Sequence, residues 1–211
     1  MFPGDVRLYP LTDIRLSGLS HAEQVARLSE GGAHLIQLRE KYLSPREFYD
    51  QAVKAMRVAR SRGVRIIIND RIDVAMASKA DGVHLGQDDF PPQAARRLLG
   101  DGAIIGLSTH NVDQAVQAST MDIDYIAVGP IFGTSTKDNP DPVVGLTGLE
   151  EIRQAVLKTP IVAIGGITSD NAPQVMKAGA NAVAVISALL IPPDETIAQT
   201  KRFIAQLSGL A

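Results

Sequence analysis

The side chains best suited to chemistry in this chain follow one short apolar run. Gln37, Arg39 and Lys41 come after Leu35 and Ile36, at the alternate spacing that places side chains on one face of a β-strand. A buried cation without a partner is costly, so an amide and two cations on one face favour a bound polyanion such as phosphate or pyrophosphate. A strand end that runs into solvent is the alternative, and it would explain one such cation better than three alternating polar groups.

Carboxylates follow the next two apolar runs. Asn69 and Asp70 end one run, and Asp88 and Asp89 come shortly after the following one. If the two runs are neighbouring strands, their carboxylates lie close together. Mg²⁺ usually takes one or two protein carboxylates together with water and phosphate oxygens. Each aspartate alone is better explained as a helix cap, but the pair beside the cationic face predicts Mg²⁺ as a cofactor.

Hydroxyl groups and a further cation come later in the chain. Ser108, after the fifth apolar run, can donate to a ligand or cap the next helix, and both interpretations stay open. The connection 129–148 is rich in Gly, Pro and Asp and is long, as binding loops in compact domains commonly are. It carries hydroxyls at Thr134 and Thr136 and a cation at Lys137. A solvated surface loop is the alternative. The place of this loop after the sixth apolar run, where a barrel would have its mouth, favours a functional loop.

Small residues end the last two apolar runs. Gly165 and Gly166 follow one run, and Ser187 follows Ile186 at the end of the other. Backbone N–H groups at such places form phosphate sites, although the glycine pair alone could be a tight turn. The residues together predict two anion sites, one for a pyrophosphate and one for a monophosphate. That inventory suits the joining of a diphosphate ester to a phosphorylated acceptor.

Eight apolar runs alternate with amphipathic stretches along the chain. The runs are Arg7–Leu11, His34–Leu38, Arg65–Ile68, Gly82–Leu85, Ala103–Leu107, Tyr125–Val128, Ile161–Ile164 and Ala182–Ile186. Helices are expected at His21–Glu30, Pro45–Arg62, Ile72–Ser78, Pro92–Leu99, Val112–Ser119, Leu149–Leu157, Asn171–Ala178 and Asp194–Leu207. Apolar runs without alternation are typical of parallel strands covered on both faces. The pattern predicts an α/β fold, a (β/α)8 TIM barrel forming a single domain over residues 1–211, with active residues at the C-terminal strand ends.

An open doubly wound sheet is the alternative fold, but no Gly-x-Gly-x-x-Gly follows the first run. The 211 residues carry a net charge of −2 and no cysteine, which argues against a basic nucleic-acid surface and excludes disulfides and thiolate metal sites. No apolar segment is long enough for a signal peptide or a membrane span, so a cytoplasmic protein is expected. Among the histidines, His84 is expected to pack in or under the barrel, and His110 is a site candidate.

Seven short motifs occur in order along the chain. They are Leu8-Tyr9 to Thr12-Asp13, Gln37-Leu38-Arg39-Glu40-Lys41, Ile68-Asn69-Asp70-Arg71, Gly82-Val83-His84-Leu85-Gly86-Gln87-Asp88-Asp89, Gly129-Pro130-Ile131-Phe132 with Thr134-Ser135-Thr136-Lys137, Ile164-Gly165-Gly166-Ile167, and Val185-Ile186-Ser187-Ala188. By these motifs the chain resembles the thiamine-phosphate synthase (thiamine-phosphate pyrophosphorylase) family over nearly its full length. Pro10, where an aliphatic residue is expected, and Gly133, where Pro is frequent, depart from the pattern without removing a functional group.

The resemblance implies an Mg²⁺-dependent transferase of thiamine biosynthesis. It would condense 4-amino-2-methyl-5-pyrimidinylmethyl diphosphate with 4-methyl-5-(2-phosphoethyl)-thiazole, by departure of pyrophosphate and attack of the thiazole nitrogen. The pyrimidine diphosphate would be held by Gln37, Leu38, Arg39, Glu40, Lys41, Asn69, Ser108 and Lys137, of which Arg39, Lys41, Ser108 and Lys137 would be catalytic. The thiazole phosphate would be held by Thr134, Ser135, Thr136, Gly166, Ile186 and Ser187. Mg²⁺ would be bound by Asp70 and Asp89 rather than Asp88.

The same resemblance suggests a homodimer that acts on small phosphorylated molecules. The nearest alternative is a thiazole tautomerase of the same barrel family, for which His110 could serve as an acid or base. A non-catalytic phosphate-binding barrel and an unrelated phosphosugar isomerase are two further alternatives. The diphosphate residues argue against the tautomerase, the paired carboxylates against the non-catalytic barrel, and the two anion sites against the isomerase.

Overall fold

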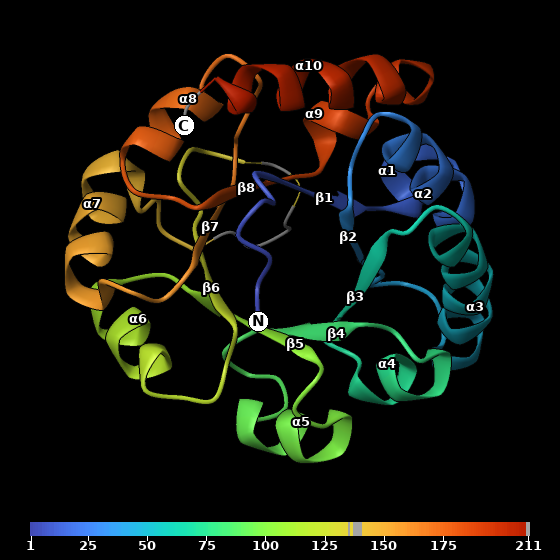
Figure 1. Ribbon diagram of the computed structural model, residues 1–211, viewed down its shortest axis with the longest axis horizontal. Coiled ribbons are helices and arrows are strands. Elements are labelled where there is room, and N and C mark those ends of the chain that lie inside the picture. The colour runs from blue at the N-terminus through green and yellow to red at the C-terminus, as the bar shows by residue number, and fades with distance from the viewer. Residues whose placement is uncertain (135, 137–140, 210–211) are drawn as a thin grey trace.

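Eight short strands form the centre of the computed structural model, which describes residues 1–134, 136 and 141–209 (Figure 1). They are β1 (Leu8–Thr12), β2 (Leu35–Leu38), β3 (Arg65–Asn69), β4 (Gly82–Leu85), β5 (Ile104–Thr109), β6 (Tyr125–Val128), β7 (Ile161–Ile164) and β8 (Ala182–Val185). Each strand pairs in parallel with the next, and β8 pairs with β1, so the sheet closes on itself. The predicted eight-stranded α/β barrel is confirmed.

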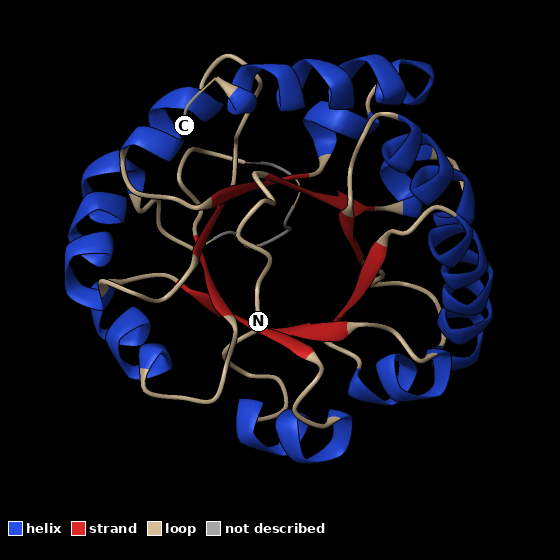
Figure 2. Cartoon of the chain, viewed as in Figure 1, coloured by secondary structure: helices blue, strands red, loops and turns tan. Residues whose placement is uncertain are grey.

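Helices surround the barrel as an outer ring (Figure 2). They are α1 (Ile14–Ser17), α2 (His21–Glu30), α3 (Pro45–Ser61), α4 (Ile72–Ser78), α5 (Pro92–Leu99), α6 (Val112–Ser119), α7 (Gly145–Val156), α8 (Ala172–Lys177), α9 (Ser187–Leu190), the 3-10 helix η1 (Pro193–Glu195) and α10 (Thr196–Ser208). Capping boxes fix the starts of α2 and α3, at Ser20 with Glu23 and at Ser44 with Glu47. α1 and α9 are absent from the sequence prediction because four residues are too few to show a helical period.

One predicted helix begins earlier in the structure than in the sequence analysis. α7 starts at Gly145, not at Leu149, because its first turn contains Gly145 and Gly148, which a sequence pattern assigns to the preceding loop. The last helix differs in the other direction, since Pro193–Glu195 form the separate 3-10 turn η1 before α10. The other helix boundaries agree within one residue.

Two apolar layers result from the alternation of side chains along each strand. Ile36 and Leu38 of β2 point outward and join a layer between barrel and helices. Leu35 belongs to the layer inside the barrel, with Tyr9 and Tyr125. Because a strand has period two, this register also sends Gln37 into the barrel interior.

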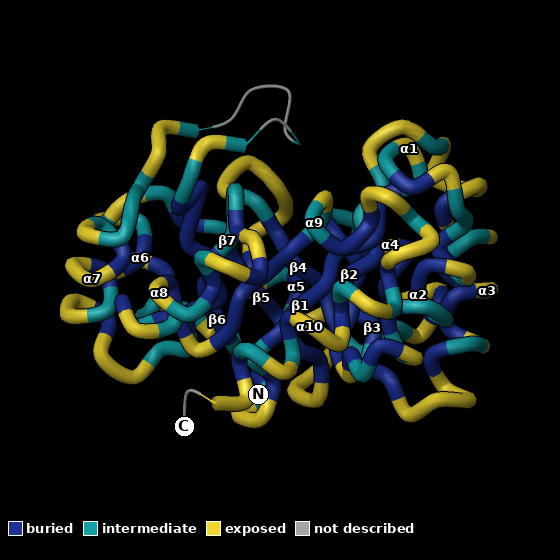
Figure 3. The backbone as a smooth tube through the Cα atoms, turned by 90° about the horizontal axis from the view of Figure 1, so that it is seen from above, coloured by how far each residue is buried: buried dark blue, intermediate teal, exposed yellow. Residues whose placement is uncertain are grey.

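The two ends of the barrel differ (Figure 3). At the N-terminal ends of the strands, Phe2 and Val6 are buried with the inner layer, and Phe2 packs on the rings of Tyr9 and Tyr125. At the opposite end, the loops that follow the strands line a cavity. The polar strand ends predicted from the sequence therefore face an accessible cavity.

No helix among the described residues is long and apolar enough to span a membrane.

Candidate functional site

A cavity of about 690 Å³ occupies the mouth at the C-terminal strand ends. It collects most of the residues predicted from the sequence, namely Gln37, Arg39, Lys41, Asn69, Asp70, Asp88, Asp89, Ser108, Thr134, Thr136, Gly166, Ile186 and Ser187. Two predicted residues, Ser135 and Lys137, lie outside the described part of the chain. The cavity therefore brings together groups from seven strands, β2 to β8, and the loops that follow them, as the barrel predicts.

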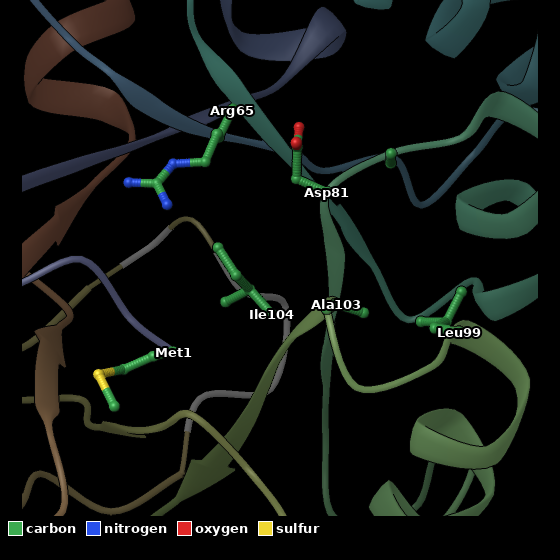
Figure 4. A pocket seen from close by; sticks show the side chains of 8 residues that line it. Met1, Arg65, Asp81, Leu99, Ala103 and Ile104 are labelled. Atoms are coloured by element: carbon green, nitrogen blue, oxygen red, sulfur yellow. The ribbon is translucent and has the colours of Figure 1, made fainter.

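A second hollow, of about 300 Å³, lies at the other end of the barrel (Figure 4). Its charged side chains are Arg65 and Asp81, and the rest of its lining includes Leu99, Ala103 and Ile104. The Asp81 carboxylate already accepts the N–H of Ile66 at 2.7 Å. This hollow lacks the converging polar groups of a binding site, so the larger cavity is the candidate site.

Two buried amides leave polar atoms without partners in the cavity. The Gln37 Nε2 group donates to the Tyr9 hydroxyl at 3.0 Å, whereas Gln37 Oε1 has no hydrogen-bond partner among the described residues. Asn69 Nδ2 likewise has none within the described chain. The two residues are only 2% and 7% exposed. A buried acceptor and a buried donor without partners cost free energy, so they favour a ligand that offers a donor and an acceptor in return.

The Arg39 guanidinium is held in place by a residue of the first strand–helix connection. Arg39 Nη1 lies 2.5 Å from Asp13 Oδ2, and Asp13 Oδ1 accepts the N–H of Leu16 and caps α1. Asp13 thus fixes one side of the guanidinium and leaves its other N–H groups for an anion. Asp13 was not predicted as functional, although it ends the first sequence motif.

Lys41 and the paired carboxylates meet across the mouth. Lys41 Nζ forms an ion pair with Asp70, and Asp89 Oδ2 accepts the N–H of Gly86 at 2.7 Å. Burial raises the pKa of Asp89, the Gly86 N–H lowers it, and the neighbouring Asp70 carboxylate raises it again, so that it stands above its ordinary value. The two predicted carboxylates are therefore close enough to repel each other.

The backbone of Asp70 is strained. Its φ of 61° lies in the left-handed region that non-glycine residues seldom adopt. The N–H of Asp70 donates to the carbonyl of His84 at 2.8 Å, which holds this conformation at the end of β3. Strain of this kind is typical of functional positions, where the surrounding structure imposes it.

A divalent cation fits this pair of carboxylates. Asp70 and Asp89 are hard oxygen donors that repel each other, and a cation between them would relieve that repulsion. No group of three or more His, Cys, Asp or Glu residues in the described ranges is arranged as a metal site. The donor set thus resembles an Mg²⁺ site that completes its coordination with water and substrate oxygens, not a full protein cage.

Ser108 contacts a buried histidine. Its Oγ lies 2.9 Å from Nε2 of His84, whose Nδ1 lies 2.9 Å from the hydroxyl of Tyr125. Burial lowers the pKa of His84 to about 4, so that the ring is neutral at physiological pH. The capping alternative for Ser108 is wrong, because Asn111 caps α6. The expected packing of His84 inside the barrel is confirmed, but its link to Ser108 was not foreseen.

Two residues of the predicted diphosphate set do not present side chains to the cavity. Leu38 points outward into the barrel–helix layer, because it alternates with inward-facing residues. Glu40 turns back on its own loop, where Oε1 accepts the N–H groups of Lys41 at 2.9 Å, Tyr42 at 2.8 Å and Leu43 at 3.2 Å. The side chains of Leu38 and Glu40 therefore do not line the cavity, and the prediction that these two residues bind the diphosphate substrate stays a prediction.

Glu40 instead braces the loop that carries the cations. His21 Nε2 lies 3.6 Å from Glu40 Oε2, and His21 Nδ1 lies 2.7 Å from the hydroxyl of Thr12. Burial alone would raise the pKa of Glu40, but the His21 ring and the loop N–H groups lower it to about 2. Glu40 is thus ionised and holds the loop in the shape that directs Lys41 into the cavity.

The opposite side of the cavity is formed largely by backbone. Gly165 and Gly166 have φ values of 103° and 62°, and a Cβ atom on Gly166 would lie 2.6 Å from the carbonyl oxygen of Gly133. The N–H of Phe132 donates to the carbonyl of Gly165 at 3.0 Å. Glycine is required here because the β6 loop lies against the β7 loop. Next to them, Ser187 begins the short helix α9.

Comparisons with known proteins agree with this site. A family model described as thiamine monophosphate synthase matches residues 8–189. A thiamine-phosphate synthase of Chloroflexus aurantiacus is 48% identical over 92% of this chain and 89% of its own length. A thiamine-phosphate synthase of Clostridium novyi is 46% identical over 89% of this chain and 92% of its own.

A solved structure is similar over almost the whole barrel. It is a thiamine phosphate pyrophosphorylase from Pyrococcus furiosus, which is 36% identical, covers 97% of this chain and 96% of its own, and superposes with a TM-score of 0.87. The resemblance inferred from the seven motifs is confirmed. The chain belongs to the thiamine monophosphate synthase family.

Proposed function

We propose that the chain joins 4-amino-2-methyl-5-pyrimidinylmethyl diphosphate to 4-methyl-5-(2-phosphoethyl)-thiazole, giving thiamine monophosphate and pyrophosphate. One observation carries this proposal. Two cations, two close carboxylates and two amides, each with one polar atom that lacks a partner among the described residues, converge in one cavity of this family member. Thiamine-phosphate synthase is also the name of its two relatives described above.

The pyrimidine end of the donor is assigned to Gln37, Asn69 and Ser108. An aminopyrimidine carries both an amino donor and ring-nitrogen acceptors. Gln37 Oε1 can accept, while Asn69 Nδ2 and the Ser108 hydroxyl can donate. A ligand of this kind would satisfy the amide atoms that have no partner within the described protein.

The diphosphate end is assigned to Arg39, Lys41 and Lys137, with Asp70 and Asp89 as ligands of Mg²⁺. When bound, Mg²⁺ would neutralise part of the charge on the leaving pyrophosphate. Arg39 keeps free N–H groups beside its Asp13 contact, and Lys41 already lies at Asp70. Lys137 lies outside the described residues and stays a prediction, with Lys137→Ala expected to lower kcat at least tenfold, about 1.4 kcal/mol.

The thiazole phosphate is assigned to the backbone-rich side of the cavity. Thr134 and Thr136 offer hydroxyls, and Gly166, Ile186 and Ser187 offer backbone groups. Backbone N–H groups after the last two strands suit a monophosphate. Ser135, predicted in the same set, lies outside the described residues.

The chemistry needs no protein nucleophile. The bond between the methylene carbon and the diphosphate oxygen breaks, and the electron-rich aminopyrimidine stabilises the cation that is left. The thiazole nitrogen then forms the new carbon–nitrogen bond. The protein contributes charge stabilisation of the leaving group through its cations and holds the two rings in line.

The first experiment combines the purified protein, both substrates and Mg²⁺, and measures thiamine monophosphate by chromatography. Product that disappears with EDTA and returns with added Mg²⁺ is the expected result. Product that persists in EDTA would contradict the metal assignment alone. No product from folded protein and intact substrates would contradict the synthase assignment.

The tautomerase alternative receives no support from these relatives or from His110. His110 Nδ1 donates to the carbonyl of Gly129 at 2.6 Å, and Nε2 lies 3.5 Å from Asp141. Both ring nitrogens therefore have contacts with the loop after β6, which favours a role in holding that loop. A homodimer, suggested by the family resemblance, and a cytoplasmic location, expected from the pattern of apolar segments, are also part of the proposal.

A further inference from the structure

Five side chains form a hydrogen-bonded chain across the inside of the barrel. Gln37 Nε2 lies 3.0 Å from the Tyr9 hydroxyl, which lies 3.1 Å from that of Tyr125. His84 connects Tyr125 to Ser108, with 2.9 Å at each ring nitrogen. We call these five residues the barrel relay. Gln37 and Ser108, the two ends of the relay, both line the cavity, as do Tyr9 and His84. The connection between the two ends runs through β1, β6 and β4.

The packing around Tyr125 confines the rings of the barrel relay to fixed positions. A Cβ atom on Gly106 would lie 2.1 Å from Cζ of Tyr125, so glycine at this position makes room for the ring. The His84 ring stacks on Tyr125 with centroids 5.5 Å apart, and the Tyr9 ring meets it edge-on at 5.9 Å. The Phe2 ring packs against the Tyr125 ring with their centroids 4.9 Å apart. Rings confined on these sides keep their hydroxyls in fixed places.

The relay has a direction that follows from counting protons. The Gln37 amide nitrogen can only donate, so the Tyr9 hydroxyl accepts and gives its single proton to Tyr125. Tyr125 has then received one proton and gives its own to Nδ1 of His84. A neutral imidazole whose Nδ1 accepts carries its proton on Nε2 and donates it to Ser108 Oγ. The hydroxyl proton of Ser108 is left to point into the cavity.

The opposite direction would leave the site with different chemistry. If His84 Nδ1 carried the proton, Ser108 would donate to Nε2 and could no longer donate to a ligand through that proton. With Gln37 still donating, the Tyr9 proton would also have no acceptor, because Tyr125 would donate back to it. A buried donor without a partner is costly, which favours the first direction.

We propose that the barrel relay has this one direction, so that Tyr125 and His84 are positioning residues that make Ser108 an obligatory donor to the pyrimidine, while Gln37 Oε1 is an obligatory acceptor. The identity of the ligand in this inference, a pyrimidine, rests on the proposed function. The direction of the relay adds the reason why the site selects a ring with an acceptor nitrogen near an amino donor. It also assigns a role to Tyr125, which does not line the cavity, and to His84, which lines it but is not among the groups expected to bind the substrate.

The first test measures the tautomer of His84 and needs no substrate. Nitrogen-15 NMR of histidine-labelled protein, with His84 assigned from His84→Gln, should show a protonated Nε2 and an unprotonated Nδ1. Tyr125→Phe should raise the population protonated at Nδ1, because the donor to that nitrogen is gone. A wild-type ring protonated at Nδ1, or a tautomer unchanged by Tyr125→Phe, would overturn the proposal.

The second test is a double-mutant cycle on kinetics. Tyr125→Phe should lower kcat/KM for the pyrimidine diphosphate about tenfold and leave KM for the thiazole phosphate within about twofold. In a Ser108→Ala background, Tyr125→Phe should change kcat/KM less than about twofold, because the Ser108 hydroxyl that the relay positions is no longer there. Full additivity of the two changes would overturn the proposal. Tyr49→Phe, on the exposed face of α3, is the matched control.

Tyr9→Phe provides a second variant in case Tyr125→Phe does not fold. It should weaken use of the pyrimidine diphosphate through Gln37, and its effect should disappear in a Gln37→Ala background. Persistence of the full effect there would contradict the relay. If wild-type protein makes no thiamine monophosphate, the proposed function fails, while the NMR experiment still decides the direction of the relay.

Discussion

The two sides of the cavity recognise anions by different means. Over β2 to β5 the groups are side chains, with Arg39 and Lys41 as cations and Asp70 and Asp89 as a pair of carboxylates. Over β7 and β8 they are mainly backbone, shaped by glycines such as Gly166. The difference teaches that leaving-group charge and phosphate anchoring can be disturbed separately. Replacing a side chain should affect the first side, and adding a Cβ atom should affect the second.

The largest expected effect is on the side-chain half. Arg39→Ala should lower kcat/KM for the pyrimidine diphosphate about 100-fold or more, because a preorganised cation at the leaving group is lost. KM for the thiazole phosphate should change less than about twofold. Steady-state kinetics with each substrate varied in turn would measure both. Arg46→Ala, at an exposed position of α3, is the control, and an equal loss for both substrates would contradict the division into two halves.

The backbone half should respond to Gly166→Ala. The new Cβ would meet the Gly133 carbonyl oxygen at 2.6 Å, and alanine disfavours a φ of 62°. We expect KM for the thiazole phosphate to rise about tenfold, with a smaller change for the pyrimidine diphosphate. Gly102→Ala, which meets no atom within 4 Å, is the control. If Gly166→Ala instead raised KM mainly for the pyrimidine diphosphate, the two halves of the cavity would not be independent.

A smaller effect, on stability, is expected from Glu40, which holds the loop after β2 that carries Lys41. Glu40→Gln should destabilise the protein by about 1 kcal/mol at pH 7, measured by urea unfolding. Because the pKa of Glu40 is lowered from 4.5 to about 2, its stabilisation is complete above pH 4.5 and is lost as the pH falls toward 2. The difference between wild type and variant should therefore shrink at pH 3. Glu30→Gln, on α2, is the control, and a pH-independent difference would refute this explanation.

The sequence predicted the side-chain half best, because strand alternation decides which way a residue points. Gln37 and Arg39 follow from that alternation, and so does the outward direction of the Leu38 side chain. Glu40 belongs to the same motif as Leu38, but its turn back onto the loop depends on backbone N–H groups that a sequence pattern does not display.

The barrel relay could not be predicted because it connects strands that are not neighbours. Tyr9, His84 and Tyr125 come from β1, β4 and β6, and only the closed register of the barrel brings their rings together. The one hint was compositional, since two tyrosines and a histidine interrupt otherwise apolar runs. Asp13 was missed for a related reason, because its partner Arg39 lies across the β1–β2 connection.

The strained backbone of Asp70 sets folding and catalysis against each other at one position. Asparagine accepts a φ near 61° readily and carries no charge, so Asp70→Asn would keep the local conformation and remove the repulsion with Asp89. The ion pair between Asp70 and the half-exposed Lys41 contributes little to stability. Losing this ion pair should therefore not cancel the stability gained by removing the repulsion between Asp70 and Asp89. A screen for thermal resistance alone would therefore select this substitution, and a screen for thiamine monophosphate production would remove it.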